Sequence, residues 1–274
     1  MLATLLLLNS LAAAPLEISP AERHADGFFA HEVRSPYQAG VTELRMLLPD
    51  DLDAAKPRRV MFVLPVEAGR EQNYGDGMAE VRRHNLHNIH RLICVQPTFS
   101  HLPWYGDHPT EPTIRQESYL LEAVLPFVRR EYAIADGAEN CLLLGFSKSG
   151  WGAVSLLVRR PDLFGRVAAW DAPLMETAPT KYGMQTVYPS PESFNGYRLD
   201  TALARNADKL AGPARIGLFA YGNFRAQHAA AHEHLTKLGI AHEHRDGPRR
   251  EHTWSSGWVP EAVEFLARTP QPKE

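Results

Sequence analysis

The chain has 274 residues and a formal net charge of −3, with 44% hydrophobic and 22% charged residues. This composition excludes a disordered or fibrous protein, and the length allows a large hydrophobic core. The charges are scattered without a basic stripe, which argues against nucleic acid as a partner. Two cysteines are too few for a disulfide framework or a thiolate zinc scaffold.

The N-terminal segment, residues 1–20, is predicted to be an apolar leader. It starts with MLATLLLLNSLAAA, a leucine run that ends in an alanine triplet. The run is too short for a stable membrane span, which takes about 20 apolar residues. Its form is typical of a signal peptide and predicts export to the periplasm or secretion. The missing basic residue before the run and Pro15 after it favour the alternatives: a mis-chosen start codon, or a cytoplasmic protein whose leader packs on its domain.

Beyond the leader, short apolar runs alternate with longer amphipathic segments. Runs of four to eight apolar residues are typical of strands buried on both faces. Residues 29–48 are expected to form an antiparallel edge of the sheet. In chain order, strands are predicted at 41–48, 59–64, 92–95, 141–146, 167–170, 216–221 and 241–244, and helices at 76–90, 118–131 (bent by Pro126), 150–159, 226–238 and 259–267.

This alternation predicts an α/β fold with a mostly parallel central sheet and helices on both faces. Residues 21–274 are expected to form one domain. Within it, residues 175–213 are rich in Pro, Asn and Gly, with only a short helix predicted. They are expected to form a short lid-like excursion over the site rather than a second domain.

The clearest sign of chemistry is GFSKSG, residues 145–150, between a buried strand and a helix. A serine on such a turn has a strained backbone and lifts its hydroxyl above the carboxyl edge of the sheet. Small neighbours such as Gly145 and Ser149 let strand and helix approach each other. The backbone N–H of Lys148, at the helix N-terminus, is predicted to bind an oxyanion. Ser147 is therefore predicted to be a nucleophile; the alternative is a helix-capping turn.

A serine nucleophile needs a base, and His252 is the histidine whose position fits best. It lies between the last predicted strand and the last helix, in a loop that ends at the same sheet edge. It also follows Ser147 in the chain, as the order serine, acid, histidine requires. His252 is predicted to be the general base; the alternative is a surface histidine.

These motifs resemble the putative-esterase family of the α/β-hydrolase fold. The likeness rests on GFSKSGWGA (145–153), HTWSSGWVPEAVEFL (252–266) and SPYQAGVTELRMLLPD (35–50). The family includes S-formylglutathione hydrolases, feruloyl and acetylxylan esterases, and mycolyltransferases. The resemblance implies an α/β-hydrolase fold, no cofactor, and a small-molecule or carbohydrate-linked ester as substrate. In its sheet order, Cys94 and Cys141 lie on strands separated by 59–64, so they are expected to be unbridged core thiols.

The acid of the triad departs from the family pattern. In most members an Asp or Glu follows the seventh strand, but here residues 221–225 read YGNFR. Asp171 ends the preceding predicted strand at the same edge and keeps the chain order, so it is predicted to be the acid. Asn223 and Asp246 are the alternatives. A turn cap is the other interpretation of Asp171.

Two further groups are predicted to complete the site. The second oxyanion donor is expected from Val66 or Glu67, because Pro65 has no N–H and the family's usual His-Gly is absent. Trp104 and Tyr105 follow the strand 92–95 and are predicted to form aromatic walls for an acyl or sugar group. The alternative for both rings is packing beneath a loop.

The sequence thus predicts a serine esterase that forms an acyl-enzyme on Ser147 with His252 as base. No metal is predicted, because the histidine repeats lack an H-E-x-x-H or third-ligand pattern and are interpreted as solvated faces. One alternative is an acyltransferase that uses the same site, as in the mycolyltransferases of the family. The other is a non-catalytic binding protein on a hydrolase scaffold.

Overall fold

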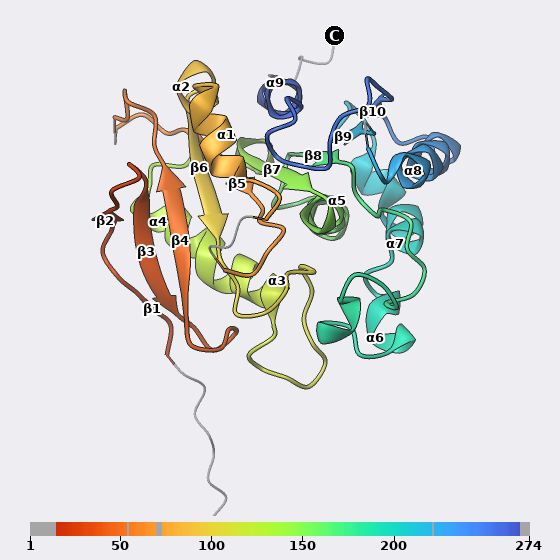
Figure 1. Ribbon diagram of the computed structural model, residues 1–274, viewed down its shortest axis with the longest axis horizontal. Helices are drawn as coiled ribbons and strands as arrows, with labels where there is room; N and C mark the ends of the chain where they lie inside the picture. Colours follow the sequence, from red (N-terminus) through yellow and green to blue (C-terminus); the bar gives the residue numbers. More distant parts are fainter. Residues whose placement is uncertain (1–14, 54, 70–72, 221, 269–274) are drawn as a thin grey trace, which may run out of the picture.

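The computed structural model describes residues 15–53, 55–69, 73–220 and 222–268 (Figure 1). Residues 1–14, the first part of the predicted leader over 1–20, lie outside this part of the chain. The described strands form one mixed sheet in the order β1-β3-β4-β6-β5-β7-β8-β9-β10, with β2 also paired to β3. The strands are β1 (Glu17–Ile18), β2 (Glu22–Arg23), β3 (Phe29–Arg34), β4 (Val41–Leu47), β5 (Arg59–Val63), β6 (Leu92–Pro97), β7 (Cys141–Phe146), β8 (Arg166–Trp170), β9 (Ile216–Phe219) and β10 (His242–Arg245).

The sheet has an antiparallel edge and a parallel body. β1, β2, β3, β4 and β6 are joined by antiparallel pairs, whereas β6 through β10 pair in parallel. Figure 1 shows the antiparallel edge in red and orange on one side and β10 with α8 in blue on the other. Glu17–Ile18 form β1 and belong to the sheet, although the sequence predicted them to be part of the leader over residues 1–20.

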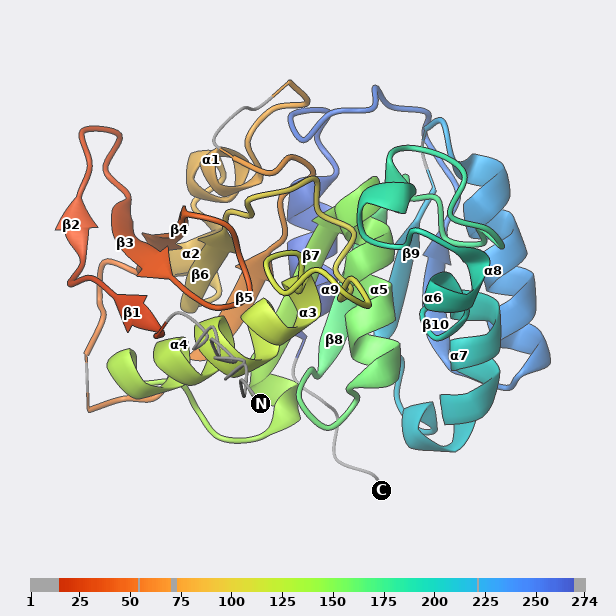
Figure 2. The ribbon, with the colours of Figure 1, turned by 90° about the horizontal axis from the view of Figure 1, so that it is seen from below.

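Helices cover both faces of the sheet (Figure 2). Apolar residues of α1, α2 and α9 share one core with one face, and those of α4, α5, α7 and α8 share the other. The mostly parallel sheet with two covered faces confirms the predicted fold class. The helices are α1 (Gly77–Arg83), α2 (Leu86–Ile89), α3 (Gln116–Ser118), α4 (Leu125–Glu131), α5 (Lys148–Arg159), α6 (Pro191–Asn195), α7 (Leu199–Asn206), α8 (Arg225–Lys237) and α9 (Val259–Ala267), with a π-helix at Tyr119–Val124 and 3₁₀ turns at Ala138–Asn140, Met184–Thr186 and Ala207–Leu210.

Two predicted helices are interrupted. The helix expected over 76–90 splits into α1 and α2 because Asn85 adopts a left-handed conformation, with φ 54°. In the helix expected over 118–131, Pro126 cannot donate to the carbonyl four residues earlier. The turn before it is a π-helix, in which Leu125 N–H donates to Leu120 O. At the place where the sequence predicted a bend, the helix therefore contains one wider, π-helical turn.

The excursion over 175–213 holds more helix than expected, namely α6, α7 and two 3₁₀ turns. Its aromatic side chains pack on α5: Trp151 lies 5.9 Å from the ring of Phe194 and 6.1 Å from that of Tyr188. Its exposed Tyr182 ring lies 5.6 Å from Phe224, next to the candidate site described below. The segment therefore packs on the helical layer while one side chain reaches that site.

The two cysteines are free and buried, as predicted, with β5 between the strands that carry them. Burial raises the pKa of the Cys141 thiol to about 12, and that of Cys94 is raised as well. Both therefore behave as neutral core side chains. No helix in the described part of the chain is long and apolar enough to cross a bilayer.

Candidate active site

Three neighbouring strands end at one level of the sheet. Phe146, Trp170 and Phe219 lie in register across β7, β8 and β9. The pairing continues for one more residue, since Ser147 N–H donates to Trp170 O and Asp171 N–H to Phe219 O, both at 3.0 Å. Ser147 and Asp171 therefore leave the carboxyl edge of the sheet side by side.

Ser147 occupies a tight turn between β7 and α5. Its φ of 54° and ψ of −126° are a combination that glycine adopts far more readily than serine. An added Cβ at Gly145 would lie 2.3 Å from Ser149 O, which confirms the predicted need for a small residue there. The buried Ser149 hydroxyl donates to Phe146 O and accepts from Phe146 N–H, so it braces the turn from inside. Lys148 begins α5, and the first N–H groups of a helix have no intrahelical acceptor.

The strained backbone predicts a stability difference between two variants that both lack the hydroxyl. Ser147→Gly should be more stable than Ser147→Ala by about 1 kcal/mol, because only glycine relaxes this conformation; its entropy cost offsets part of a gain of about 1–3 kcal/mol. For a chain of this size that corresponds to about 2 °C in the thermal midpoint. Differential scanning calorimetry measures the difference. A Ser147→Ala protein that melts at or above the temperature of Ser147→Gly would show that the turn is not strained.

The imidazole of His252 joins the serine to the carboxylate. Its Nε2 lies 3.1 Å from Ser147 Oγ and its Nδ1 2.5 Å from Asp171 Oδ2. Asp171 is fully buried, and Ser147 keeps 7% of its surface exposed. A hydroxyl, an imidazole and a carboxylate in this sequence of contacts form the arrangement that activates a serine.

Aromatic rings hold the histidine loop in place. The His252 ring lies 4.4 Å from Phe146 and 6.0 Å from Trp170, centroid to centroid. Trp170 in turn stacks on Trp258 at 5.1 Å and 6°. The indole N–H of Trp258 donates to Thr253 O at 3.1 Å and closes the loop. The second tryptophan of HTWSSGW (252–258) thus fixes the loop against β7 and β8.

The loop after β9 holds the carboxylate of Asp171 through main-chain donors. Asn223 N–H donates to Oδ2 at 2.8 Å and Phe224 N–H to Oδ1 at 2.6 Å. Burial alone would raise the pKa of the Asp171 carboxyl, but the bonds from His252, Phe224 and Asn223 outweigh burial, so this pKa lies below its ordinary value. The group is therefore ionised throughout the neutral range.

The three residues that the sequence left open for the acid position lie in different places. Asn223 contacts Asp171 through its main chain, and it is Asp171 that meets His252. The carboxylate of Asp246 makes a two-point ion pair with Arg225, at 2.6 Å for each bond. Neither alternative occupies the position beside the imidazole.

Gly222 is a neighbour of Asp171 that the sequence analysis did not single out. A Cβ at this position would lie 2.1 Å from Asp171 Oδ2. Gly222→Ala should therefore displace the carboxylate and lower kcat of an ester hydrolase by about 10- to 100-fold, as displacements of about 1 Å do. Steady-state kinetics on purified protein measure the effect. Gly196→Ala is the matched control, because no atom lies within 4 Å of an added Cβ there; equal activity of both variants would contradict the role of this contact.

The loop expected to supply the second oxyanion donor is fixed at both ends. The Tyr105 hydroxyl donates to Pro65 O at 2.5 Å, and Phe99 N–H donates to Ala68 O at 2.7 Å. Val66 is buried between them, and the carboxylate of Glu67 accepts from the Asn73 side chain and main chain. Val66 and Glu67 thus sit on a braced loop between β5 and α1.

The prediction that Trp104 and Tyr105 form substrate walls is wrong for this structure. Both side chains are fully buried. Trp104 packs edge-on against Trp151 at 5.5 Å, and an added Cβ at Gly152 would lie 2.1 Å from the Tyr105 ring, which shows how closely that ring approaches α5. The rings fill the core beneath the loop because their apolar faces gain more from burial there than at the surface.

An open cavity of about 700 Å³ adjoins the histidine. It is lined by polar and charged residues, among them Arg249, Glu251 and Asn223. On the nucleophile side, burial lowers the pKa of the Lys148 ammonium, while the Glu67 carboxylate acts in the opposite direction. Charged and polar side chains thus lie in the cavity beside His252, and a cation lies next to the nucleophile in the chain.

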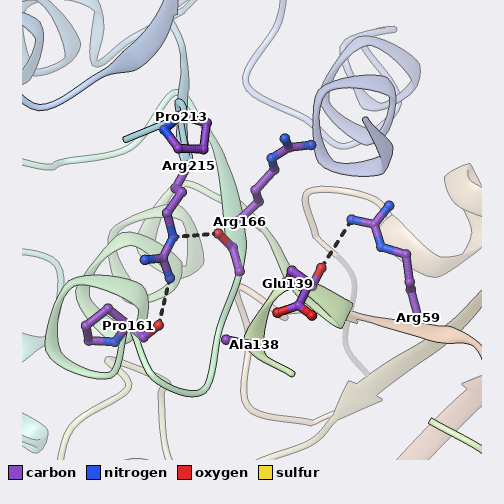
Figure 3. A pocket seen from close by; sticks show the side chains of 8 residues that line it. Arg59, Ala138, Glu139, Pro161, Arg166, Pro213 and Arg215 are labelled. Carbon is purple, nitrogen blue, oxygen red and sulfur yellow. Dashed lines mark hydrogen bonds between the residues drawn. The ribbon is translucent and has the colours of Figure 1, made fainter. Parts of the chain in front are cut away.

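A second cavity, of about 500 Å³, lies at the amino edge of the strands, away from the serine (Figure 3). Arg59, Arg166 and Arg215 line it; in Figure 3 dashed lines join Arg215 to main-chain carbonyls, among them that of Pro161, and Arg59 to that of Glu139. Arg59 donates to Ala267 O and Leu266 O at the end of α9, and Arg215 to Gly165 O and Pro161 O beyond α5. These cations close helix ends and contribute to the fold at that edge.

The described residues contain no group of three or more His, Cys, Asp or Glu that could hold a metal ion. His232, His242 and His244 gather into a cluster, with His232 Nδ1 2.7 Å from His242 Nε2 and the rings of His232 and His244 4.4 Å apart.

The hydroxyl of Ser147, the imidazole of His252 and the carboxylate of Asp171 are the groups that nucleophilic chemistry on a carbonyl or phosphoryl centre requires.

The sequence places this site in a known family. Residues 103–243, about half of the chain, match the family model described as "Putative esterase". The chain belongs to this family. The matched segment contains Ser147 and Asp171, and His252 follows it. No curated protein sequence matches the chain.

Solved structures with the same architecture support the fold assignment. One is FphF, a fluorophosphonate-binding serine hydrolase of Staphylococcus aureus, in a substrate-bound form (17% identity, 92% of this chain and 100% of that chain, TM-score 0.70). Another is an S-formylglutathione hydrolase from Agrobacterium tumefaciens (15% identity, 91% and 98%, TM-score 0.70). A third is MPT51 from Mycobacterium tuberculosis (15% identity, 90% and 97%, TM-score 0.63). At these identities the likeness establishes the fold, an α/β-hydrolase fold.

Proposed function

We propose that this member of the esterase family is a serine hydrolase that cleaves carboxylic esters through an acyl-enzyme on Ser147. The observation that carries the proposal is the continuous line of contacts from Ser147 Oγ to His252 to Asp171, at a strained turn between strand and helix. Each member comes from a different element of the sheet edge. A serine that only caps a helix, or a histidine that only lies at the surface, would not need these contacts.

In the proposed reaction, His252 Nε2 takes the proton of the Ser147 hydroxyl as Oγ attacks the carbonyl carbon. The tetrahedral intermediate collapses when the ester C–O bond breaks and the imidazolium returns the proton to the leaving alcohol. Water then attacks the acyl-enzyme with His252 again as base, which releases the acid and restores the serine. Asp171 holds the imidazole with its Nδ1 protonated and stabilises the imidazolium that forms.

The developing oxyanion needs main-chain donors fixed before the reaction. Lys148 N–H, at the start of α5 directly after the nucleophile, is one proposed donor. The other is Val66 N–H or Glu67 N–H, on the loop that Tyr105 and Phe99 brace. Both donors would act without reorganisation, because Lys148 belongs to α5 and hydrogen bonds at Pro65 and Ala68 hold the main chain on either side of Val66 and Glu67.

The two alternatives differ in what supports them. The non-catalytic alternative rested on the missing carboxylate after the strand now described as β9, and Asp171 supplies a carboxylate from β8. The acyltransferase alternative uses the same acyl-enzyme and differs only in the acceptor, an alcohol in place of water. Turnover in the presence of competing alcohols separates the two: hydrolysis predicts acid as the main product at low alcohol concentration.

A fluorophosphonate probe tests the proposal directly, because it reacts with activated serines. Wild-type protein should take up one label per chain, located on Ser147 by mass spectrometry, and should release acid from at least one ester of a panel of short acyl, aromatic acyl and acetylated sugar esters. Ser147→Ala is the control and should remain unlabelled. A folded wild-type protein that takes no label would overturn the proposal.

A further inference from the structure

Asp171 leaves β8 in a left-handed backbone conformation, which residues other than glycine adopt uncommonly. Its φ is 43°, in the left-handed region. Hydrogen bonds fix the main chain on both sides of it: Asp171 N–H donates to Phe219 O at 3.0 Å, and the next amide, Ala172 N–H, donates to His228 Nε2 at 2.8 Å. The hydrogen bond from Ala172 N–H is accepted by the side chain of His228, so a substitution can remove it.

His228 makes this contact from the first turn of α8. Its own N–H donates to Phe224 O at 3.0 Å, so the ring belongs to the same turn that gives Phe224 N–H to the carboxylate. One helical turn therefore holds both the side chain of Asp171 and the amide that follows it. A change at the His228 contact would be felt where the carboxylate meets His252.

The direction of this hydrogen bond defines the tautomer of His228. A main-chain N–H can only donate, so Nε2 carries the lone pair and the proton is on Nδ1. The side chain is fully buried, and Nδ1 has no hydrogen-bond partner within the described part of the chain. An apolar side chain would remove this unsatisfied group, but it would leave the buried N–H of Ala172 without its acceptor, so the contact to Ala172 accounts for a histidine here.

The contact does not switch with pH in the working range of an esterase. Burial lowers the pKa of His228 to about 3; the facing charge of Asp171 acts in the opposite direction and His244 adds to the lowering. The ring is therefore neutral above that pH, and its lone pair remains available to Ala172 N–H. It is a constant acceptor.

We propose that His228 is a positioning residue that, through the amide of Ala172, holds Asp171 in the orientation in which its carboxylate meets His252. The inference rests on the proposed hydrolase function for its kinetic consequence, whereas the contact itself exists independently of any substrate. Without the acceptor, the turn can relax toward an ordinary backbone conformation and withdraw the carboxylate from the imidazole.

A pair of amide variants isolates the acceptor. In His228→Gln the amide oxygen can reach the position of Nε2, whereas in His228→Asn the side chain is one methylene too short. His228→Asn should lower kcat about 10- to 100-fold with KM nearly unchanged and move the acidic limb of the kcat/KM profile to lower pH. His228→Gln should stay within about threefold of wild type. Rates are divided by the fraction of chains that a fluorophosphonate labels. Equal kcat and equal pH profiles for wild type and His228→Asn would overturn the inference.

Nuclear magnetic resonance gives a test that needs neither turnover nor a stable variant. In wild type, the ring nitrogens of His228 should show a protonated Nδ1 and a bare Nε2; the opposite tautomer would overturn the inference, even if His228→Asn fails to fold. The deshielded proton shared by His252 Nδ1 and Asp171 should persist in His228→Gln and vanish in a folded His228→Asn. Wild type that shows both signals but takes no fluorophosphonate label would refute the proposed function and leave the positioning contact standing.

Discussion

Replacing Ser147 by alanine should lower ester turnover by about 10⁴- to 10⁶-fold, because the acyl-enzyme can no longer form and only the oxyanion donors and substrate binding remain. The fold should persist, since the strained turn and the pairing of Ser147 N–H with Trp170 O involve only main chain. Single-turnover and steady-state assays on the best ester of a panel measure the loss, and circular dichroism verifies the fold.

Ser255→Ala is the matched control for this variant. Ser255 is exposed and lies in the loop of His252, with its hydroxyl near that of Thr253 at 3.3 Å. Its hydroxyl contacts Thr253, so the variant should keep turnover within about twofold, as surface substitutions usually do. If Ser147→Ala retained more than a hundredth of wild-type turnover, the nucleophile would have to be another residue.

Asp171→Asn should lower kcat by about 10³- to 10⁴-fold at neutral pH. The amide cannot stabilise an imidazolium, and its NH₂ group would face the donors of Asn223 or Phe224, or the Nδ1 proton of His252. Asp246→Asn is the matched control, because this carboxylate is paired with Arg225 and lies outside the triad. It should stay within about threefold. Comparable losses in both variants would contradict the assignment of Asp171.

The same substitution has a consequence for acid stability. The pKa of the Asp171 carboxyl is lower in the folded chain than its ordinary value, so its ionised form stabilises the fold at neutral pH. That contribution is lost as pH falls through the lowered pKa. Denaturant unfolding from pH 7 down to pH 3 should therefore show a smaller loss of stability in Asp171→Asn than in wild type.

The alternation of short apolar runs and amphipathic segments predicted the parallel body of the sheet. The runs mark strands buried on both faces and the amphipathic segments mark the helices that cover them, and both patterns can be recognised from neighbouring residues in the chain. The break between α1 and α2 was not predicted, since one left-handed residue, Asn85, decides it. Tertiary packing also decided the fate of Trp104 and Tyr105. A loop that follows a strand can turn its rings outward or inward. The residues of α5 that draw them in, Trp151 for Trp104 and Gly152 for Tyr105, are each 47 residues away.

At the site, three of the residues singled out from the sequence lie in contact: Ser147, His252 and Asp171. Ser147 and Asp171 directly follow predicted strands and His252 lies in the loop after the last one, so chain order and sheet topology indicated them, although Asn223 and Asp246 stayed open as alternatives to Asp171. Gly222 and His228 could not be found in this way, because their roles depend on a steric approach and a main-chain acceptor contact. A glycine just after a strand was the only available signal for the first of them.

The proposed acid, Asp171, directly follows β8, and the described part of the loop after β9 contributes to it the main-chain N–H groups of Asn223 and Phe224 and the small size of Gly222. Side chains at positions 223 and 224 are therefore free to diverge during evolution without altering the contacts of the carboxylate. A signature that demands Asp or Glu after the seventh strand would classify such chains as inactive homologues. Those that keep a carboxylate one strand earlier and a glycine opposite it should instead be screened for activity.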